Sequence, residues 1–196
     1  MRLGPIITSP QEIQGWCDFE NIYFDIVRGA MDNFTFLEVG AWLGKSTAIM
    51  GTLIKKSGKQ IKFYTVDTWT GDNTCQAQQE AVKKLGGCAF NAFWQNIVDL
   101  HLEQHVHPII SESLSSLDKI TDKQFEFIFL DGDHKYDNFS KELPYFFPHV
   151  RPGGYIGGHD FNGDVKRAVG EFFPPKGLNI IRDKSSWMVK VPFIAS

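Results

Sequence analysis

Two short segments that combine acidic residues with histidine follow two apolar stretches of the chain. Asp131 and His134 come directly after one stretch, and His159 and Asp160 end the next. If these stretches are neighbouring parallel strands, their carboxyl ends converge on one crevice, and the four ionisable groups share a small volume. Asp131 and Asp160 would repel each other there unless a cation or a shared proton lay between them. The pattern therefore predicts either a divalent-cation site or general-base catalysis.

The histidines of the chain divide by position. His134 and His159 are candidate bases because each lies at a predicted strand end. A structural interpretation is equally open for Asp133, which can cap the following helix, and for His134, which can be solvated. The other four histidines lie away from strand ends and are expected to have surface or core roles: His101, His105, His107 and His149.

A glycine turn between Gly40 and Gly44 follows another apolar stretch and opens a predicted helix. A P-loop for nucleotide phosphates needs one more residue between its glycines, although Ser46 and the distant acid Asp131 fit that pattern. A dinucleotide-binding turn needs glycine where Trp42 stands, because a side chain there would block the pyrophosphate. Both alternatives are disfavoured, and a P-loop-like nucleotide hydrolase is kept as the second functional hypothesis.

Two carboxylates at predicted strand ends favour a third ligand for this turn. Glu38 lies two residues before Gly40, where a buried charge is costly unless it meets a cation or hydrogen-bond donors. An aminoacyl ligand supplies an ammonium group. Asp67 ends the next predicted strand and is placed to accept both hydroxyls of a ribose. Either acid alone is a weak signal, but together they describe S-adenosylmethionine.

The elements that must position these residues alternate between strands and helices. Apolar strands alternating with helical stretches indicate an α/β fold with a parallel sheet covered on both faces. The last two strands are joined by four residues, too few for a parallel crossover, and so form an antiparallel hairpin. The predicted strands are residues 35–39, 61–66, 106–110, 125–130, 155–158, 178–182 and 187–191. Together they predict a doubly wound, Rossmann-like, seven-stranded sheet in one domain, residues 1–196.

Two helical regions are expected to shape the acceptor side. A capping box at Ser9 predicts a helix that continues through Val27, within lid helices over residues 1–31. A helical insert over residues 70–104 carries helices near 76–85 and 89–103. Four aromatic residues there can line an acceptor pocket, although their helical spacing is equally typical of a core: Trp69, Phe90, Phe93 and Trp94.

The motifs resemble those of class I S-adenosylmethionine-dependent methyltransferases. The stretch 38–46, Glu-x-Gly-x-aromatic-x-Gly-x-Ser, is similar to the first motif of metal-dependent O-methyltransferases. The stretches 66–72, 131–136 and 151–160 resemble a bacterial and phage branch that includes sugar O-methyltransferases. The resemblance covers residues 34–192 and implies methyl transfer to a hydroxyl of a small molecule such as a sugar.

The resemblance also implies roles for individual residues. Glu38 and the amides near Gly40 would hold the methionyl part, Asp67 the ribose, and the segment at Glu112 the adenine. The implied cofactor-binding residues are Glu38, Gly40, Ala41, Trp42, Gly44, Ser46, Asp67, Thr68, Glu112, Ser113 and Asp131. The implied catalytic residues are Asp131, His134 and His159, and the implied ligands of a divalent cation are Asp131, His159 and Asp160.

The presence of His159 leaves the identity of the metal open. Metal-dependent relatives use three oxygen ligands for Mg²⁺ or a similar ion, whereas histidine suits Mn²⁺, Fe²⁺ or Zn²⁺. Either a cation lowers the pKa of the acceptor hydroxyl, or a histidine base removes its proton. A binding module that keeps the cofactor but has no turnover is the third functional hypothesis.

Composition limits the partners. The chain has 196 residues, 20 basic and 23 acidic side chains, a net charge of −3 and 42% hydrophobic residues, as is usual for one globular domain. The sequence lacks a basic cluster and an apolar run of membrane-spanning length, so we expect neither nucleic acid nor membrane as a partner. Three widely spaced cysteines indicate no disulfide framework. A cytoplasmic protein with a small-molecule acceptor is expected; its oligomeric state is open, a homodimer included.

Overall fold

A seven-stranded sheet forms the centre of the computed structural model, which describes residues 4–73 and 75–193. The strand order is β3-β2-β1-β4-β5-β7-β6; β1 to β5 are parallel, and β7 is antiparallel to both of its neighbours. The strands are β1 Thr35–Val39, β2 Lys62–Asp67, β3 His107–Ile110, β4 Phe125–Leu130, β5 Val150–Gly158, β6 Ile180–Asp183 and β7 Ser186–Lys190. The predicted Rossmann-like sheet with its terminal antiparallel hairpin is thereby confirmed.

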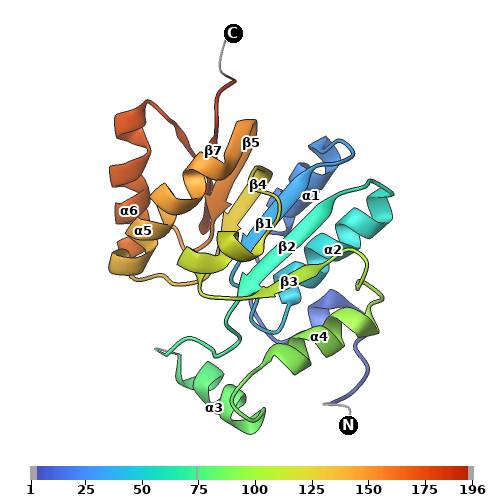
Figure 1. Cartoon of the computed structure of the whole chain (residues 1–196). Coiled ribbons are helices and arrows are strands. Elements are labelled where there is room, and N and C mark those ends of the chain that lie inside the picture. The colour runs from blue at the N-terminus through green and yellow to red at the C-terminus, as the bar shows by residue number, and fades with distance from the viewer. Residues whose placement is uncertain (1–3, 74, 194–196) are drawn as a thin grey trace.

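Helices cover the sheet on both faces. Figure 1 shows α5 and α6 on one side of the sheet and α1 and α2 on the other. The α-helices are α1 Glu20–Gly29, α2 Lys45–Ser57, α3 Gln76–Lys84, α4 Phe90–Asp99, α5 Tyr136–Phe146 and α6 Gly163–Phe172. Short 3₁₀ turns are η1 Pro10–Glu12, η2 Ser113–Lys119, η3 Phe147–His149 and η4 Pro174–Lys176. None of the helices among the described residues is long and apolar enough to cross a membrane.

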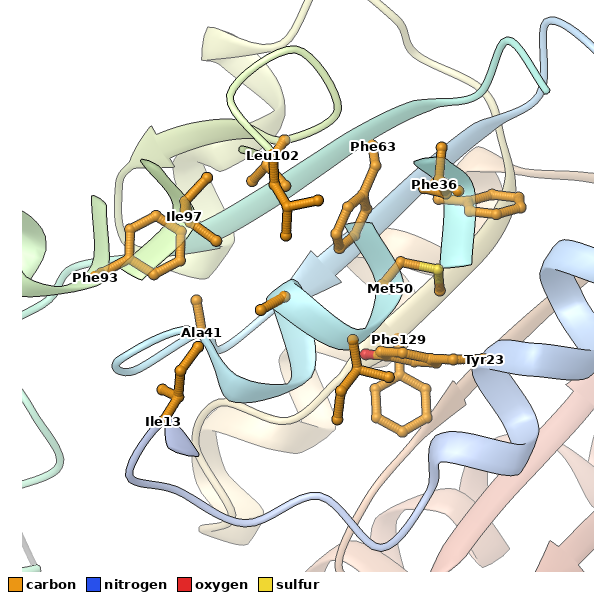
Figure 2. Close-up of a cluster of buried hydrophobic side chains, with 14 of the residues drawn as sticks. Ile13, Tyr23, Phe36, Ala41, Met50, Phe63, Phe93, Ile97, Leu102 and Phe129 are labelled. Atoms are coloured by element: carbon orange, nitrogen blue, oxygen red, sulfur yellow. The ribbon is translucent and has the colours of Figure 1, made fainter. Parts of the chain in front are cut away.

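Alternate side chains of the central strands fill two separate apolar clusters. Phe36 and Phe127 pack on the α1 and α2 face, in the cluster drawn in Figure 2, whereas Leu37 and Ile128 pack on the α5 and α6 face. All four are at most 1% exposed. Complete burial of such a side chain contributes roughly 1.5–3 kcal/mol, so the strands that carry the site are firmly held. This two-sided burial explains why these strands are apolar almost throughout.

The N-terminal region differs from the predicted continuous helix. Ser9 does cap a helical turn, accepting the amide N–H of Gln11, but this turn ends at Glu12 as a three-residue 3₁₀ element. Helix α1 begins only at Glu20. Residues 13–19, here called the N-terminal strap, have neither helical nor strand structure, and Gly15 within them has a φ of +148°. This positive φ, which suits glycine, is incompatible with a continuing α-helix.

Two helices, α3 and α4, form in the predicted insert. Two of the four aromatic residues are fully buried, and the other two, Phe90 and Trp94, are partly buried against the same cluster. Trp69 and Phe93 are fully buried, with ring centroids 4.7 Å apart, and Phe90 lies edge-on to Trp69 at 4.9 Å. The indole N–H of Trp69 donates to the carbonyl oxygen of Trp42 at 2.8 Å. The structure therefore supports a core role, and not a pocket lining, for Trp69 and Phe93. Both pack against the glycine turn, at Trp42 and at Gly44 respectively.

Candidate active site

The glycine turn leaves β1 at the carboxyl edge of the sheet, directly beside the end of β4. The amide of Gly40 donates to the carbonyl oxygen of Val66 at 2.8 Å, and the amide of Asp131 donates to that of Val39 at 2.7 Å. Gly40 has a φ of +94°, and a Cβ atom there would lie 2.1 Å from the carbonyl oxygen of Asp131. Only glycine allows the two chains to pass this closely.

Glu38 is buried in a cage of hydroxyl groups. One carboxylate oxygen accepts from Tyr23 at 2.9 Å, and the other accepts from Thr47 at 2.5 Å and from Thr65 at 2.8 Å. Burial raises the pKa of Glu38, while the hydrogen bonds from Thr47, Ser46 and Thr65 lower it. Glu38 is 1% exposed, so it ties α2 and α1 to the sheet. Its contact with an aminoacyl ammonium stays a prediction.

Asp67 fixes the glycine turn. One of its oxygens accepts the amides of Ala41 and Trp42, each at 2.8 Å, and the other accepts the amide of Trp69 at 2.6 Å. A P-loop presents such amides to phosphate, whereas here a carboxylate already occupies them. The P-loop alternative therefore loses its structural basis. Asp67 is partly exposed, and its contact with ribose hydroxyls stays a prediction.

The segment predicted to border the adenine follows β3 and packs on α5. Glu142 of α5 is buried beneath it, 1% exposed, and its Oε2 atom lacks a hydrogen bond within the described ranges 4–73 and 75–193. Burial raises the pKa of Glu142 to about 7, although a hydrogen bond with Ser113 lowers it and the charge of Asp133 adds to the rise. Sequence reasoning missed Glu142, because a glutamate inside an amphipathic helix carries no sign that it is buried. The adenine contacts of Glu112 and Ser113 stay predictions.

The predicted ionisable cluster forms at the ends of β4 and β5. His134 Nε2 lies 3.5 Å from Asp131 Oδ1 and 3.3 Å from Asp160 Oδ2. His159 Nδ1 lies 3.5 Å from each of the same two oxygens. Two carboxylates thus face two imidazole rings across the crevice. Asp131, His134 and Asp160 have ligand atoms that all lie within 4.8 Å of one another, a spacing compatible with one metal ion. This group contains His134 where the predicted ligand set has His159.

The sequence left a structural interpretation open for Asp133 and for His134, and their contacts can now be compared with it. Asp133 accepts the amide of Lys135 at 2.9 Å and contacts the side chain of Asn138, so it fixes the turn that leads into α5. The predicted cap is not formed, because the N-cap residue is Lys135 and no side chain caps the helix there. The His134 side chain is 38% exposed, as the solvated alternative expects, but its Nε2 atom is buried and makes no hydrogen bond to any described residue. This nitrogen instead lies between two carboxylate oxygens, at 3.5 and 3.3 Å, which a cation could also engage.

The carboxylates favour the charged form of both rings. Burial lowers the pKa of His159, but hydrogen bonding to Asp131 and the charges of Asp131 and Asp160 outweigh it and raise the pKa to about 9. The Asp131 carboxylate likewise raises the pKa of His134, although burial opposes this. The rings thus neutralise two negative charges that a cation could neutralise instead.

Two further residues, Asp18 and Ser185, complete the surroundings of His159. Asp18 Oδ1 lies 2.8 Å from His159 Nε2, and Ser185 Oγ lies 2.9 Å from the same nitrogen and donates to Asp18 Oδ2 at 2.7 Å. Asp18 belongs to the N-terminal strap and Ser185 to the turn of the terminal hairpin. No local sequence pattern signals this meeting of three distant segments.

A cavity of about 840 Å³ lies elsewhere, between α1 and the face of β5, β7 and β6. Its lining includes Ile26, Phe36, Tyr155 and Met188, and it reaches the amino-terminal end of β4. The ionisable cluster contributes no residue to it. The cavity therefore does not coincide with the predicted site, which is identified by the chemistry of its side chains.

Comparison with known proteins gives these motifs a family. A family model described as a methyltransferase domain matches residues 37–161, which include the glycine turn, Asp67 and the ionisable cluster. This match covers more than half of the chain. The chain belongs to this methyltransferase family. Its domain is an S-adenosylmethionine-dependent methyltransferase, as the first motif predicts, and the nucleotide-hydrolase alternative is not favoured.

Solved structures share the fold of this methyltransferase. The O-methyltransferase NovP has a TM-score of 0.68 at 15% identity, over 88% of this chain and 79% of NovP. A protein from Staphylococcus aureus described as a putative caffeoyl-CoA O-methyltransferase has a TM-score of 0.64 at 16% identity, over 93% of this chain and 87% of that chain. At these identities the likeness concerns the fold alone.

A curated sequence relative is the uncharacterised protein R132 of Acanthamoeba polyphaga mimivirus. It is 26% identical to this methyltransferase over 128 residues, which are 64% of this chain and 50% of R132. The chain thus matches half the length of that relative. The description of R132 names neither an acceptor nor a metal.

Proposed function

We propose that this methyltransferase transfers a methyl group to a hydroxyl oxygen of a small molecule such as a sugar, at the carboxyl ends of β4 and β5. The observation that carries the proposal is the pair Asp131 and Asp160 facing two imidazole rings. Oxygen acceptors need a group that stabilises or removes the hydroxyl proton, and this cluster offers both kinds. The absence of a basic cluster from the sequence supports a small acceptor over nucleic acid.

We further propose a divalent cation held by Asp131, Asp160 and an imidazole nitrogen of His159, with His134 as the alternative imidazole ligand. The donor set fits, because the separations of 3.3–3.5 Å between each imidazole nitrogen and the two carboxylate oxygens are those of neighbouring ligands around one ion. Bonds of about 2.1 Å place neighbouring ligands about 3.0 Å apart at right angles and about 3.4 Å apart at the tetrahedral angle. An imidazole ligand favours Mn²⁺, Fe²⁺ or Zn²⁺ over Mg²⁺.

The chain's own residues would share the remaining work. Asp67 holds the glycine turn through the amides of Ala41 and Trp42, so that this turn is preorganised on the donor side. When bound, S-adenosylmethionine supplies the electrophilic methyl group, and a cation would lower the pKa of an acceptor hydroxyl. Asp131 borders both sides, because its backbone meets the glycine turn and its carboxylate meets the imidazoles.

The test is methyl transfer from labelled S-adenosylmethionine to a panel of sugars and other hydroxylated molecules, after chelation and with Mg²⁺, Mn²⁺ or Zn²⁺ restored. Asp160→Ala is expected to abolish metal-dependent turnover and to leave the affinity for S-adenosylhomocysteine nearly unchanged. Asp183→Ala, an exposed acid on β6, is the matched control and should behave as the wild type. Full activity without metal would refute the cation and leave His134 or His159 as the base.

A further inference from the structure

The N-terminal strap connects the two halves of the site. At its start Ile13 is 2% exposed and lies beside Ala41 of the glycine turn (Figure 2). A methyl group added at Gly15 would lie 3.5 Å from Cβ of Lys45, so the strap continues along the first turn of α2. At its end Phe19 is 1% exposed and packs on Phe129 of β4, with ring centroids 4.6 Å apart. The strap therefore runs from the donor side to the ionisable cluster.

Asp18 meets His159 on the side of the ring opposite the cluster. Its carboxylate is held at both oxygens, by His159 Nε2 at 2.8 Å and by Ser185 Oγ at 2.7 Å. The Phe19 ring contacts the imidazole from another direction, with centroids 5.1 Å apart. His159 is thus fixed by the strap and by the hairpin turn, and its side chain is only 14% exposed.

We propose that Asp18 is a positioning residue that orients His159 as a ligand for the divalent cation, an inference that rests on the proposed cation site. Hydrogen bonding of Nε2–H to the Asp18 carboxylate leaves Nδ1 as the nitrogen with a free electron pair. That nitrogen is the one that faces Asp131 and Asp160, at 3.5 Å from each. A carboxylate behind a ligating histidine fixes its ring and tautomer and raises its basicity.

A consequence is that cation binding and closure of the strap are coupled. Asp18 is part of the strap, so a cation that favours this orientation of His159 also favours the docked strap. By linkage, a docked strap raises cation affinity by the same factor. Because Ile13 and Gly15 lie against the glycine turn, the strap would then also cover the donor side.

The experiment measures Mn²⁺ affinity of the full chain by electron paramagnetic resonance, with S-adenosylhomocysteine present. Asp18→Ala is expected to weaken Mn²⁺ binding 10- to 100-fold, the effect usual for such partners of a ligating histidine. Asp18→Asn keeps an acceptor oxygen without the charge and should lose less. The matched control is Asp25→Ala, an exposed acid paired with Arg28 on α1, which should bind Mn²⁺ as the wild type does.

A second readout reports on the strap directly. Hydrogen exchange of the amides of residues 14–18 should slow when Mn²⁺ is added to the wild type and should not respond in Asp18→Ala. If Asp18→Ala proves unstable, Ser185→Ala removes only the second anchor of the carboxylate and should weaken Mn²⁺ binding to a smaller extent. A purely structural role of Asp18 would lower stability without a metal-dependent change in exchange.

The outcomes separate this inference from the proposed function. If the wild type binds Mn²⁺ and Asp18→Ala binds it equally well, the positioning role is overturned and the cation site stands. If the wild type does not bind Mn²⁺, the cation site itself fails, and the inference fails with it. Weakening in the Asp18 variants with no change in Asp25→Ala supports both.

Discussion

Replacing Glu142 by glutamine tests whether the buried carboxyl group of α5 makes the protein less stable as the pH rises. Glu142 is 1% exposed, has one oxygen without a partner among the described residues, and has a pKa raised to about 7 from an ordinary value of 4.5. Glutamine has nearly the same shape as the protonated acid and cannot ionise. The variant therefore removes the titration and keeps the packing.

The sign and size of the effect follow from the two pKa values. The folded chain holds the proton more tightly than the unfolded chain, so Glu142 imposes no penalty well below pH 4.5 and a growing one as the pH rises to 7. The full penalty is about 3 kcal/mol, most of which appears between pH 5 and pH 8. This figure is an upper estimate, because water can enter around the charged form.

The assay is urea unfolding of the wild type and Glu142→Gln at pH 5 and pH 8. The free energy of unfolding of the variant, relative to the wild type, should rise by about 2 to 3 kcal/mol from the lower to the higher pH. Taking the difference between the two proteins cancels the histidines, which titrate in both. Glu171→Gln is the control that should show almost no change over this range, since hydrogen bonds from Tyr136 and Arg167 lower the pKa of that exposed carboxyl and its titration therefore falls below pH 5. A difference that is constant between the two pH values would refute the reasoning.

Three other outcomes are expected. Saturating S-adenosylhomocysteine should raise the melting temperature, because ligand at 100 times its dissociation constant adds about 2.7 kcal/mol to the free energy of unfolding, and ATP should not raise it. The reverse result would contradict the family assignment. Asp67→Ala should lower the free energy of unfolding in urea by about 2 kcal/mol and weaken cofactor binding in calorimetry, because the Ala41 and Trp42 amides lose their acceptor. Unchanged values for both would show that water replaces the Asp67 carboxylate. Gly40→Ala should cost more than about 3 kcal/mol, since its Cβ would overlap the Asp131 carbonyl oxygen, and a loss under 1 kcal/mol would disprove that crowding.

The sheet and the cluster were predictable because each depends on a local pattern. Buried parallel strands such as Phe125–Leu130 are apolar apart from Glu126, and short connections fix the antiparallel hairpin. Residues that directly follow such strands must meet at one edge, which is why Asp131 and Asp160 were found. The break in the N-terminal helix was missed because a good capping box at Ser9 says nothing of where a helix ends, and Gly15 alone carried that information.

The remaining site residues depend on contacts that no spacing encodes. Asp18 and Ser185 are 167 positions apart and meet at His159 only because the strap and the hairpin turn reach the end of β5 together. Glu142 lies on a helix with an ordinary amphipathic pattern, and its burial results from packing beneath Ser113. Long-range packing of this kind is a property of the folded chain and leaves no periodic trace in the sequence.

The carboxylates of the site divide into two groups by what satisfies them, and this division locates the chemistry. Glu38 and Asp67 have their hydrogen-bonding capacity largely filled by hydroxyls and amides of the chain, so they fix the backbone on the donor side. Asp131 and Asp160 instead face imidazole nitrogens at 3.3–3.5 Å, distances too long for strong hydrogen bonds. Charges left this incompletely paired are those that a cation or an acceptor hydroxyl can still engage, so catalysis belongs at the ends of β4 and β5.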